Sequence, residues 1–153
     1  MKLRTLFLTL ALALFGVQLC SAQDNLGSWK LNEAKSKLPA GMAHVVTSSY
    51  TAEGDQIKNV GDGVDPSGAP FHVEWVGKFD GKDYPVTGSP MMDARSYEQV
   101  NPTTLLVTNK KDGKTVGTSR IVTSADGKTR TVTITQTDPS GKALTGTAVY
   151  DKQ

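Results

Sequence analysis

The segment 71–79 shows the clearest alternation of apolar and polar side chains along the chain. Its apolar side chains fall on odd positions, namely Phe71, Val73, Trp75 and Phe79. His72 and Glu74 occupy positions between them. Because successive side chains of a strand point to opposite faces, this pattern predicts a strand with one buried face. Turn-forming residues at 65–68 and 80–82 flank the segment, so we expect antiparallel neighbours joined by short connections.

The same strand-favouring composition, rich in Val, Thr, Ile and aromatic residues, recurs through the rest of the chain. The predicted strands are residues 28–32, 45–51, 56–64, 70–79, 94–100, 104–110, 115–123, 129–137 and 143–150. The turns between most of them contain Asp, Pro and Gly, which favour tight reversals of the backbone. The chain is therefore predicted to be a meander of antiparallel hairpins.

Strands of similar length joined in sequence order favour an all-β, antiparallel up-and-down β-barrel of roughly eight to ten strands. A two-sheet sandwich is the competing arrangement. One short helix is expected near the start of the barrel, with Asn32 as its cap, Glu33 in its first turn, and Pro39 and Gly41 beyond its end.

The longest irregular stretch, residues 83–93, carries Tyr84, Met91 and Met92. A long loop with apolar side chains at a barrel mouth is often functional, and it could control ligand access. Alternatively, the loop only bridges one end of the barrel and packs its own side chains.

The N-terminus has the layout of a secretory signal peptide over residues 1–22. Lys2 and Arg4 precede the apolar run 6–17, which is shorter than the roughly 20 residues of a membrane-spanning helix. We therefore expect a single β-barrel domain over residues 23–153, exported to the periplasm or the medium, with no transmembrane span in the mature chain. Lipid attachment at Cys20 is an alternative, although Leu19 stands where bacterial lipoproteins have a small residue.

The charge balance argues against a nucleic-acid partner. The 17 Lys and Arg residues include Lys2 and Arg4, so removal of the leader leaves 15 basic residues against 15 acidic ones. Such a neutral surface provides no electrostatic footprint for nucleic acid. The single cysteine, Cys20, lies in the leader, so the stability of the mature domain must come from core burial.

Few residues suggest catalysis, and we expect no enzymatic activity, cofactor or metal. His72 and Glu74 share a strand face and could form a pair of metal ligands or an acid–base pair. That face lies opposite the apolar one, however, so a solvated polar surface is the simpler interpretation. The turn aspartates lack the spacing of a calcium-binding EF-hand, and turn formation already accounts for them.

Five residues are candidate ligand-binding residues of the barrel interior: Trp75, Phe79, Arg95, Tyr97 and Arg120. The aromatic side chains would provide apolar area, and a guanidinium or phenol would orient a polar end of the ligand. If Val116 and Val122 face the core, alternation sends Arg120 inward with them. A buried guanidinium needs a carboxylate, several acceptors or an anionic ligand. The alternative is that Arg120 covers an aromatic ring such as Trp29 and closes the barrel bottom.

The motif Gly27-Ser28-Trp29, followed by a short helical turn and a meander of hairpins, resembles the Gly-x-Trp opening of the lipocalin and calycin group of ligand-binding barrels. The segments 27–32, 35–37, 80–88 and 148–152 also resemble a set of small exported bacterial proteins of uncharacterised function. The chain lacks the lipocalin Thr-Asp-x segment, a disulfide pair and a helix after the last predicted strand. The resemblance implies a barrel and small-molecule binding, and it carries over no catalytic residue.

The leading prediction from the sequence is an exported, lipocalin-like barrel that binds a small, largely apolar ligand in its interior without catalysis. The alternative is a structural or protein-interaction module of the cell envelope with a filled core and no ligand. An enzyme of unknown reaction is a third possibility. The volume of the interior separates the first two.

Overall fold

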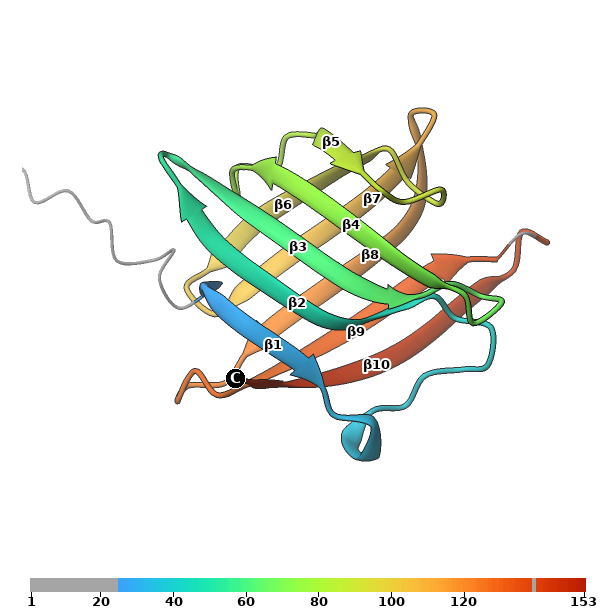
Figure 1. Cartoon of the computed structure of the whole chain (residues 1–153), viewed down its shortest axis with the longest axis horizontal. Helices are drawn as coiled ribbons and strands as arrows, with labels where there is room; N and C mark the ends of the chain where they lie inside the picture. Colours follow the sequence, from blue (N-terminus) through green and yellow to red (C-terminus); the bar gives the residue numbers. More distant parts are fainter. Residues whose placement is uncertain (1–24, 139) are drawn as a thin grey trace, which may run out of the picture.

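The strands form one closed antiparallel barrel in the order β1-β10-β9-β8-β7-β6-β5-β4-β3-β2, so every strand pairs with its neighbours in sequence and β1 pairs with β10 (Figure 1). This computed structural model describes residues 25–138 and 140–153. Its strands are β1 Gly27–Leu31, β2 His44–Glu53, β3 Gln56–Val64, β4 Pro70–Gly77, β5 Tyr84–Thr87, β6 Ala94–Asn101, β7 Thr104–Lys111, β8 Lys114–Thr123, β9 Thr129–Thr137 and β10 Ala143–Lys152. The predicted all-β up-and-down barrel is confirmed. The predicted signal peptide, residues 1–22, and Cys20 lie outside the described residues.

Asp residues shape the hairpin turns, as their spacing predicts. In the turn after β3, Oδ1 of Asp65 accepts hydrogen bonds from the backbone N–H groups of Ser67 at 2.8 Å and Ala69 at 2.9 Å. Gly68 in the same turn has a φ of 85°, a conformation that favours glycine. The hydrogen bond from the Ser67 hydroxyl contributes most to lowering the pKa of Asp65 below its usual range. These local contacts fix the reversals between consecutive strands.

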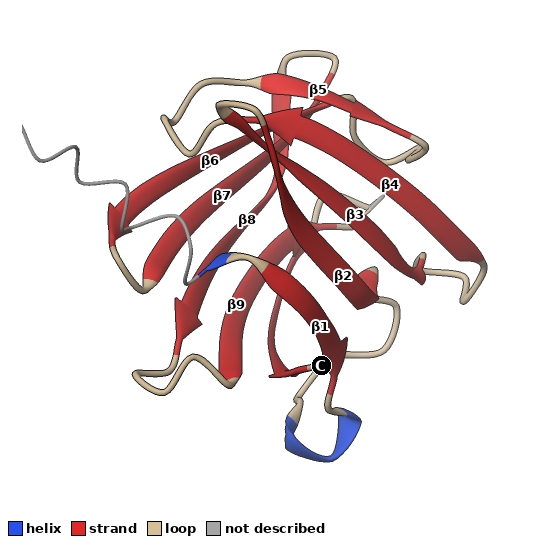
Figure 2. Ribbon diagram, turned by 60° about the vertical axis from the view of Figure 1, so that its left-hand side comes forward, coloured by secondary structure: helices blue, strands red, loops and turns tan. Residues whose placement is uncertain are grey.

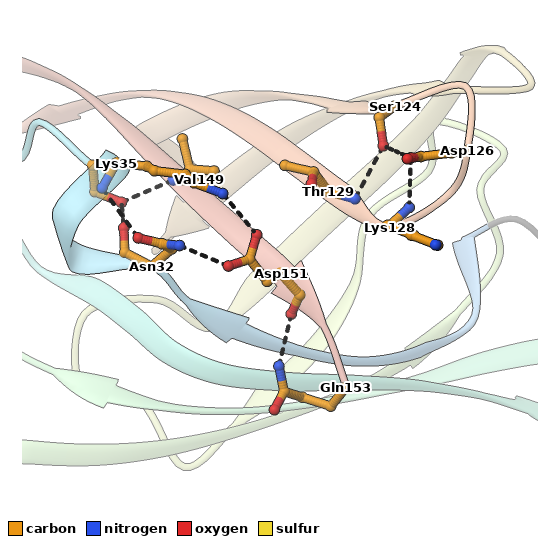
Figure 3. A network of polar contacts seen from close by, with 10 residues as sticks. Asn32, Lys35, Ser124, Asp126, Lys128, Thr129, Val149, Asp151 and Gln153 are labelled. Atoms are coloured by element: carbon orange, nitrogen blue, oxygen red, sulfur yellow. Dashed lines mark hydrogen bonds and ion pairs between the residues drawn. The ribbon is translucent and has the colours of Figure 1, made fainter.

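The predicted N-terminal helix is a single 3₁₀ turn, η2 Glu33–Lys35. Its cap is Asn32, whose Oδ1 accepts a hydrogen bond from the backbone N–H of Lys35 at 3.1 Å. The Asn32 amide also donates to Asp151 on β10 at 2.7 Å (Figure 3). Figure 2 shows η2 beyond the end of β1. The turn is therefore fastened to the outside of the barrel wall.

Residues 84–87, predicted as part of a loop, form the short strand β5. β5 pairs with β4 through Trp75 and Val86, and with β6 through Tyr84 and Arg95. The sequence obscures this strand because it is only 4 residues long and contains Pro85. The irregular connection between β5 and β6 is thereby shortened to residues 88–93.

Aromatic side chains fill one part of the barrel interior around Trp75, which is 1% exposed. The Trp75 ring stacks on Phe79 with centroids 6.3 Å apart and meets the Tyr97 ring at 4.6 Å. Tyr84 packs edge-on against Trp75 at 5.8 Å. Within residues 25–138 and 140–153, no helix has the length and apolar character needed to cross a bilayer.

Candidate functional site

The barrel encloses a cavity of about 530 Å³, within the range of small-molecule binding sites. Its lining includes Pro66, Met91 and Asp138, which belong to loops at one end of the barrel. The walls are largely aliphatic, with contributions from four strands: Val73, Val107, Ile121, Val132 and Ile134. The cavity therefore runs from the loop end into an apolar interior.

Small side chains leave space in the part of the barrel that contains the cavity. Gly61, Gly117 and Ser119 all line the cavity, and Ser119 pairs across the sheet with Val107 and Ile134. The large rings of the Trp75 cluster lie outside the lining, apart from Tyr97. The separation of small and aromatic inward residues leaves room for a ligand on one side of the aromatic core.

The floor of the cavity is formed around Arg130, which is 2% exposed. Its guanidinium lies 3.9 Å from the centre of the Trp29 ring and 4.7 Å from that of Tyr50. Nη2 of Arg130 donates to the Asn25 carbonyl at 2.7 Å, and Nε donates to the Thr123 hydroxyl at 3.3 Å. Burial lowers the pKa of Arg130, because the charged form loses hydration. Arg130 thus closes this end by packing between two aromatic rings.

A second buried guanidinium, that of Arg95, forms the main polar group in the cavity wall. It is 7% exposed. Nε donates to Asn109 Oδ1 at 2.7 Å, and Nη1 donates to Asn59 Oδ1 at 3.2 Å and to the Tyr97 hydroxyl at 3.3 Å. Nη2 reaches the sulfur of Met92 at 3.1 Å. All four partners of Arg95 are uncharged.

Two tyrosines extend this polar cluster inward. The Tyr97 hydroxyl donates to Asn59 at 3.2 Å and lies 3.2 Å from the Tyr50 hydroxyl. Burial raises the pKa of Tyr50 well above its usual range, so its phenol is neutral at physiological pH. These phenols can donate or accept hydrogen bonds, but they do not compensate the charge of Arg95.

Among the described residues, neither Arg95 nor Arg130 forms an ion pair with a carboxylate. Asp138 lines the cavity at its loop end, but its Oδ1 accepts from the backbone N–H groups of Ser140 at 2.8 Å and Lys142 at 2.9 Å. The described part of the interior therefore carries two buried guanidinium groups that no carboxylate pairs.

The structure separates the five candidate ligand-binding residues. Arg95 and Tyr97 both line the cavity and contact each other. Trp75 and Phe79 lie behind Tyr97 in the aromatic core and do not line the cavity. Trp75 still supports the polar cluster, because its indole N–H donates to the Arg95 carbonyl at 3.0 Å.

The expected inward orientation of Arg120 is wrong, since its side chain is exposed and does not line the cavity. The pairing of β7 with β8 shifts register between Asn109 and Lys110, a bulge that changes the side-chain alternation near the start of β8. Val122 is consequently 38% exposed, on the same outer face as Arg120. Arg130, rather than Arg120, covers the Trp29 ring.

The pair His72 and Glu74 lies on the exposed outer face of β4. Nδ1 of His72 lies 2.7 Å from Asp62, and Nε2 lies 3.4 Å from Glu74. Hydrogen bonds to Asp62, and secondly to Glu74, raise the pKa of His72 above its ordinary value. In the described ranges, no group of three or more His, Cys, Asp or Glu side chains could hold a metal. This cluster is separate from the cavity.

Sequence reasoning did not identify Asn59, Asn109 and Arg130 as parts of the interior. A signal existed for all three. Alternation places Arg130 on the same face as Val132, Asn59 on the same face as Ile57, and Asn109 on the same face as Val107. Buried polar residues in an otherwise apolar stripe were thus the detectable feature.

The chain was compared with models of known protein families, and no family model matches it. A search of curated proteins also gave no significant match. The barrel and its cavity therefore provide the information about function.

Proposed function

We propose that this barrel binds a small, largely apolar molecule in its cavity without transforming it. The single observation that carries the proposal is the hollow of about 530 Å³, which has aliphatic walls and one polar cluster at Arg95. Such a combination is typical of binding sites in which apolar area provides affinity and a few polar groups fix orientation. The resemblance of Gly27-Ser28-Trp29 to the lipocalin opening supports the same function.

We further propose that the protein is exported, to the periplasm or the medium. The support is the signal-like sequence of residues 1–22, with its basic start and apolar centre. Attachment through a lipid on Cys20 is the less favoured form of the same proposal. The resemblance to small exported bacterial proteins of uncharacterised function agrees with this location.

A protein-interaction module is the second candidate function. Its support is the outer face of β6, β7 and β8, where Val100 is 50% exposed, Leu106 37% and Val122 38%. Such a module would use its surface and would leave the cavity unused. The two functions differ in which face of the same strands makes contact.

A substitution that fills the cavity with a larger side chain distinguishes the two functions. Ser119 faces the cavity and Thr118, its neighbour on β8, is exposed on the outer face. Ser119→Phe should fill the space and lower the affinity for Nile red, a neutral apolar fluorophore, by about tenfold or more. Thr118→Phe is the matched control and should leave the affinity unchanged.

Both variants should be titrated by fluorescence after circular dichroism has shown that they fold. Equal affinity of the wild type and the Ser119→Phe variant would contradict binding inside the barrel. Loss of affinity only in the Thr118→Phe variant would favour the outer face.

A further inference from the structure

We propose that the ligand of this cavity is a carboxylate-headed amphiphile whose carboxylate binds Nη2 of Arg95. This inference rests on the proposed function, because it specifies the chemical class of the molecule that the cavity takes. It follows from the environment of Arg95, which is polar enough to hold the guanidinium and leaves its charge uncompensated.

The charge of Arg95 is buried and has no anionic partner among the described residues. A guanidinium that is only 7% exposed has lost most of its hydration, and burial of an unpaired charge is unfavourable. Asn59, Asn109 and Tyr97 occupy Nε and Nη1 with neutral oxygen acceptors. They hold the side chain in place, but an anion is still required to balance its charge within the described interior.

Nη2 is the nitrogen of Arg95 that lacks an oxygen partner. Its acceptor is the thioether of Met92, at 3.1 Å, and a thioether is a weak acceptor. Met92 belongs to the connection 88–93 and lines the cavity together with Arg95. A carboxylate in the cavity can therefore replace the sulfur at Nη2 and form a charge-assisted hydrogen bond, which is shorter and stronger.

The cavity wall around Arg95 indicates the chemistry of the rest of the ligand. Beyond Arg95 the cavity wall is aliphatic, with Val73, Val107 and Ile121 among the lining residues. This wall suits a hydrocarbon tail. A single guanidinium nitrogen whose acceptor is only a thioether suits one carboxylate better than a multiply charged phosphate group. The site thus matches a molecule with one negative charge and an apolar body.

Arg130 is a poorer anion site, although it is also buried and lacks a carboxylate. Its guanidinium is packed between the Trp29 and Tyr50 rings, at 3.9 and 4.7 Å from their centres. Its Nη2 already donates to the Asn25 carbonyl at 2.7 Å, an oxygen acceptor that Arg95 Nη2 lacks. Arg130 is therefore engaged in closing the barrel.

The test compares decanoate with decanamide, which has the same chain and no charge. Their dissociation constants are measured by displacement of Nile red at about pH 8, where a free carboxylic acid is ionised. The wild type should prefer decanoate by about 10- to 100-fold. Arg95→Gln should remove this preference, measured as the ratio of the two dissociation constants in a variant that circular dichroism shows to be folded. Arg120→Gln removes the same charge from the outer surface and should retain the preference.

A second variant keeps the test decisive if the Arg95→Gln variant does not fold. Met92→Glu places a carboxylate beside Arg95, and this internal anion should compete with decanoate and remove its preference over decanamide. Equal affinity of the wild type for decanoate and decanamide would overturn the inference and leave the proposed function standing. Failure of Nile red, decanoate and decanamide alike to bind would instead refute the proposed function. A preference for decanoate that survives either Arg95→Gln or Met92→Glu would place the anion elsewhere.

Discussion

Removal of the Trp75 ring should destabilise the barrel strongly, because this ring is the centre of the aromatic core. Trp75 is 1% exposed and contacts Phe79, Tyr84 and Tyr97 at centroid distances of 6.3, 5.8 and 4.6 Å. Replacement of a buried Trp by Ala typically costs about 3–5 kcal/mol. The variant also loses the hydrogen bond from the indole to the Arg95 carbonyl, which contributes about 1 kcal/mol. We expect Trp75→Ala to lower the free energy of unfolding by about 4–6 kcal/mol.

Urea unfolding followed by far-ultraviolet circular dichroism measures this loss, since the signal reports the sheet and does not depend on the deleted fluorophore. Val122→Ala is the control, because Val122 is 38% exposed on the outer face and should change stability by less than about 0.5 kcal/mol. A loss below about 1 kcal/mol for Trp75→Ala would refute the reasoning. It would mean that the ring is not closely packed, and that the interior is open on this side as well.

Three further changes test other parts of the structure. The His72 ring should titrate in an NMR experiment above the usual value of about 6.5, and Asp62→Asn should lower its midpoint, because the hydrogen bond to Asp62 is the main cause of the raised pKa. The associated stabilisation is fully present below the unfolded-state pKa and is lost as the pH rises through the raised folded value, so Asp62→Asn should flatten the stability profile there. Gly63→Ala should lower the free energy of unfolding by about 2 kcal/mol or more in urea denaturation, because the added Cβ would overlap the His44 carbonyl. Unchanged stability of this variant would contradict the close approach of β2 and β3. Arg130→Met should cost about 2 kcal/mol in the same assay through loss of its ring contacts and hydrogen bonds, and a cost near zero would contradict its role in closing the barrel.

The sequence was sufficient to predict the barrel because its strands and turns are specified locally. Alternation around Val73 and Trp75 identifies a strand with one buried face, and Asp65 with Gly68 identifies the turn before it. Repetition of the two signals through the chain leaves few ways to pair the strands. Pairing of β1 with β10 then satisfies the backbone N–H and C=O groups that an open sheet would expose at its two edges.

The candidate site was only partly predictable, since a bulge and a short strand alter the alternation. The register shift beside Lys110 turns Arg120 outward, whereas no comparable shift occurs between β9 and β10, where Arg130 faces inward. A bulge depends on pairing with the neighbouring strand, so the sequence of β8 alone does not reveal it. The strand β5 was missed for a similar reason, because only its pairing with β4 and β6 identifies it.

The cavity itself also depends on combinations of residues that are distant in sequence. Gly61, Gly117 and Ser119 lie at inward positions on two strands, and the hollow exists because their small volumes meet in the same half of the barrel. The position of the Arg95 guanidinium likewise depends on hydrogen bonds to Asn59 and Asn109, which lie on other strands. Sequence patterns give the direction of each side chain, but the space between them follows only from the closed barrel.

The most direct test of binding inside the barrel is an NMR measurement of contacts between decanoate and methyl groups of the protein. Nuclear Overhauser effects should connect the decanoate chain with the inward methyl groups of Val107 and Ile121, which line the cavity. Effects confined to the exposed methyl groups of Leu106 and Val122 would show that the ligand lies on the outer face, and would contradict the proposed function.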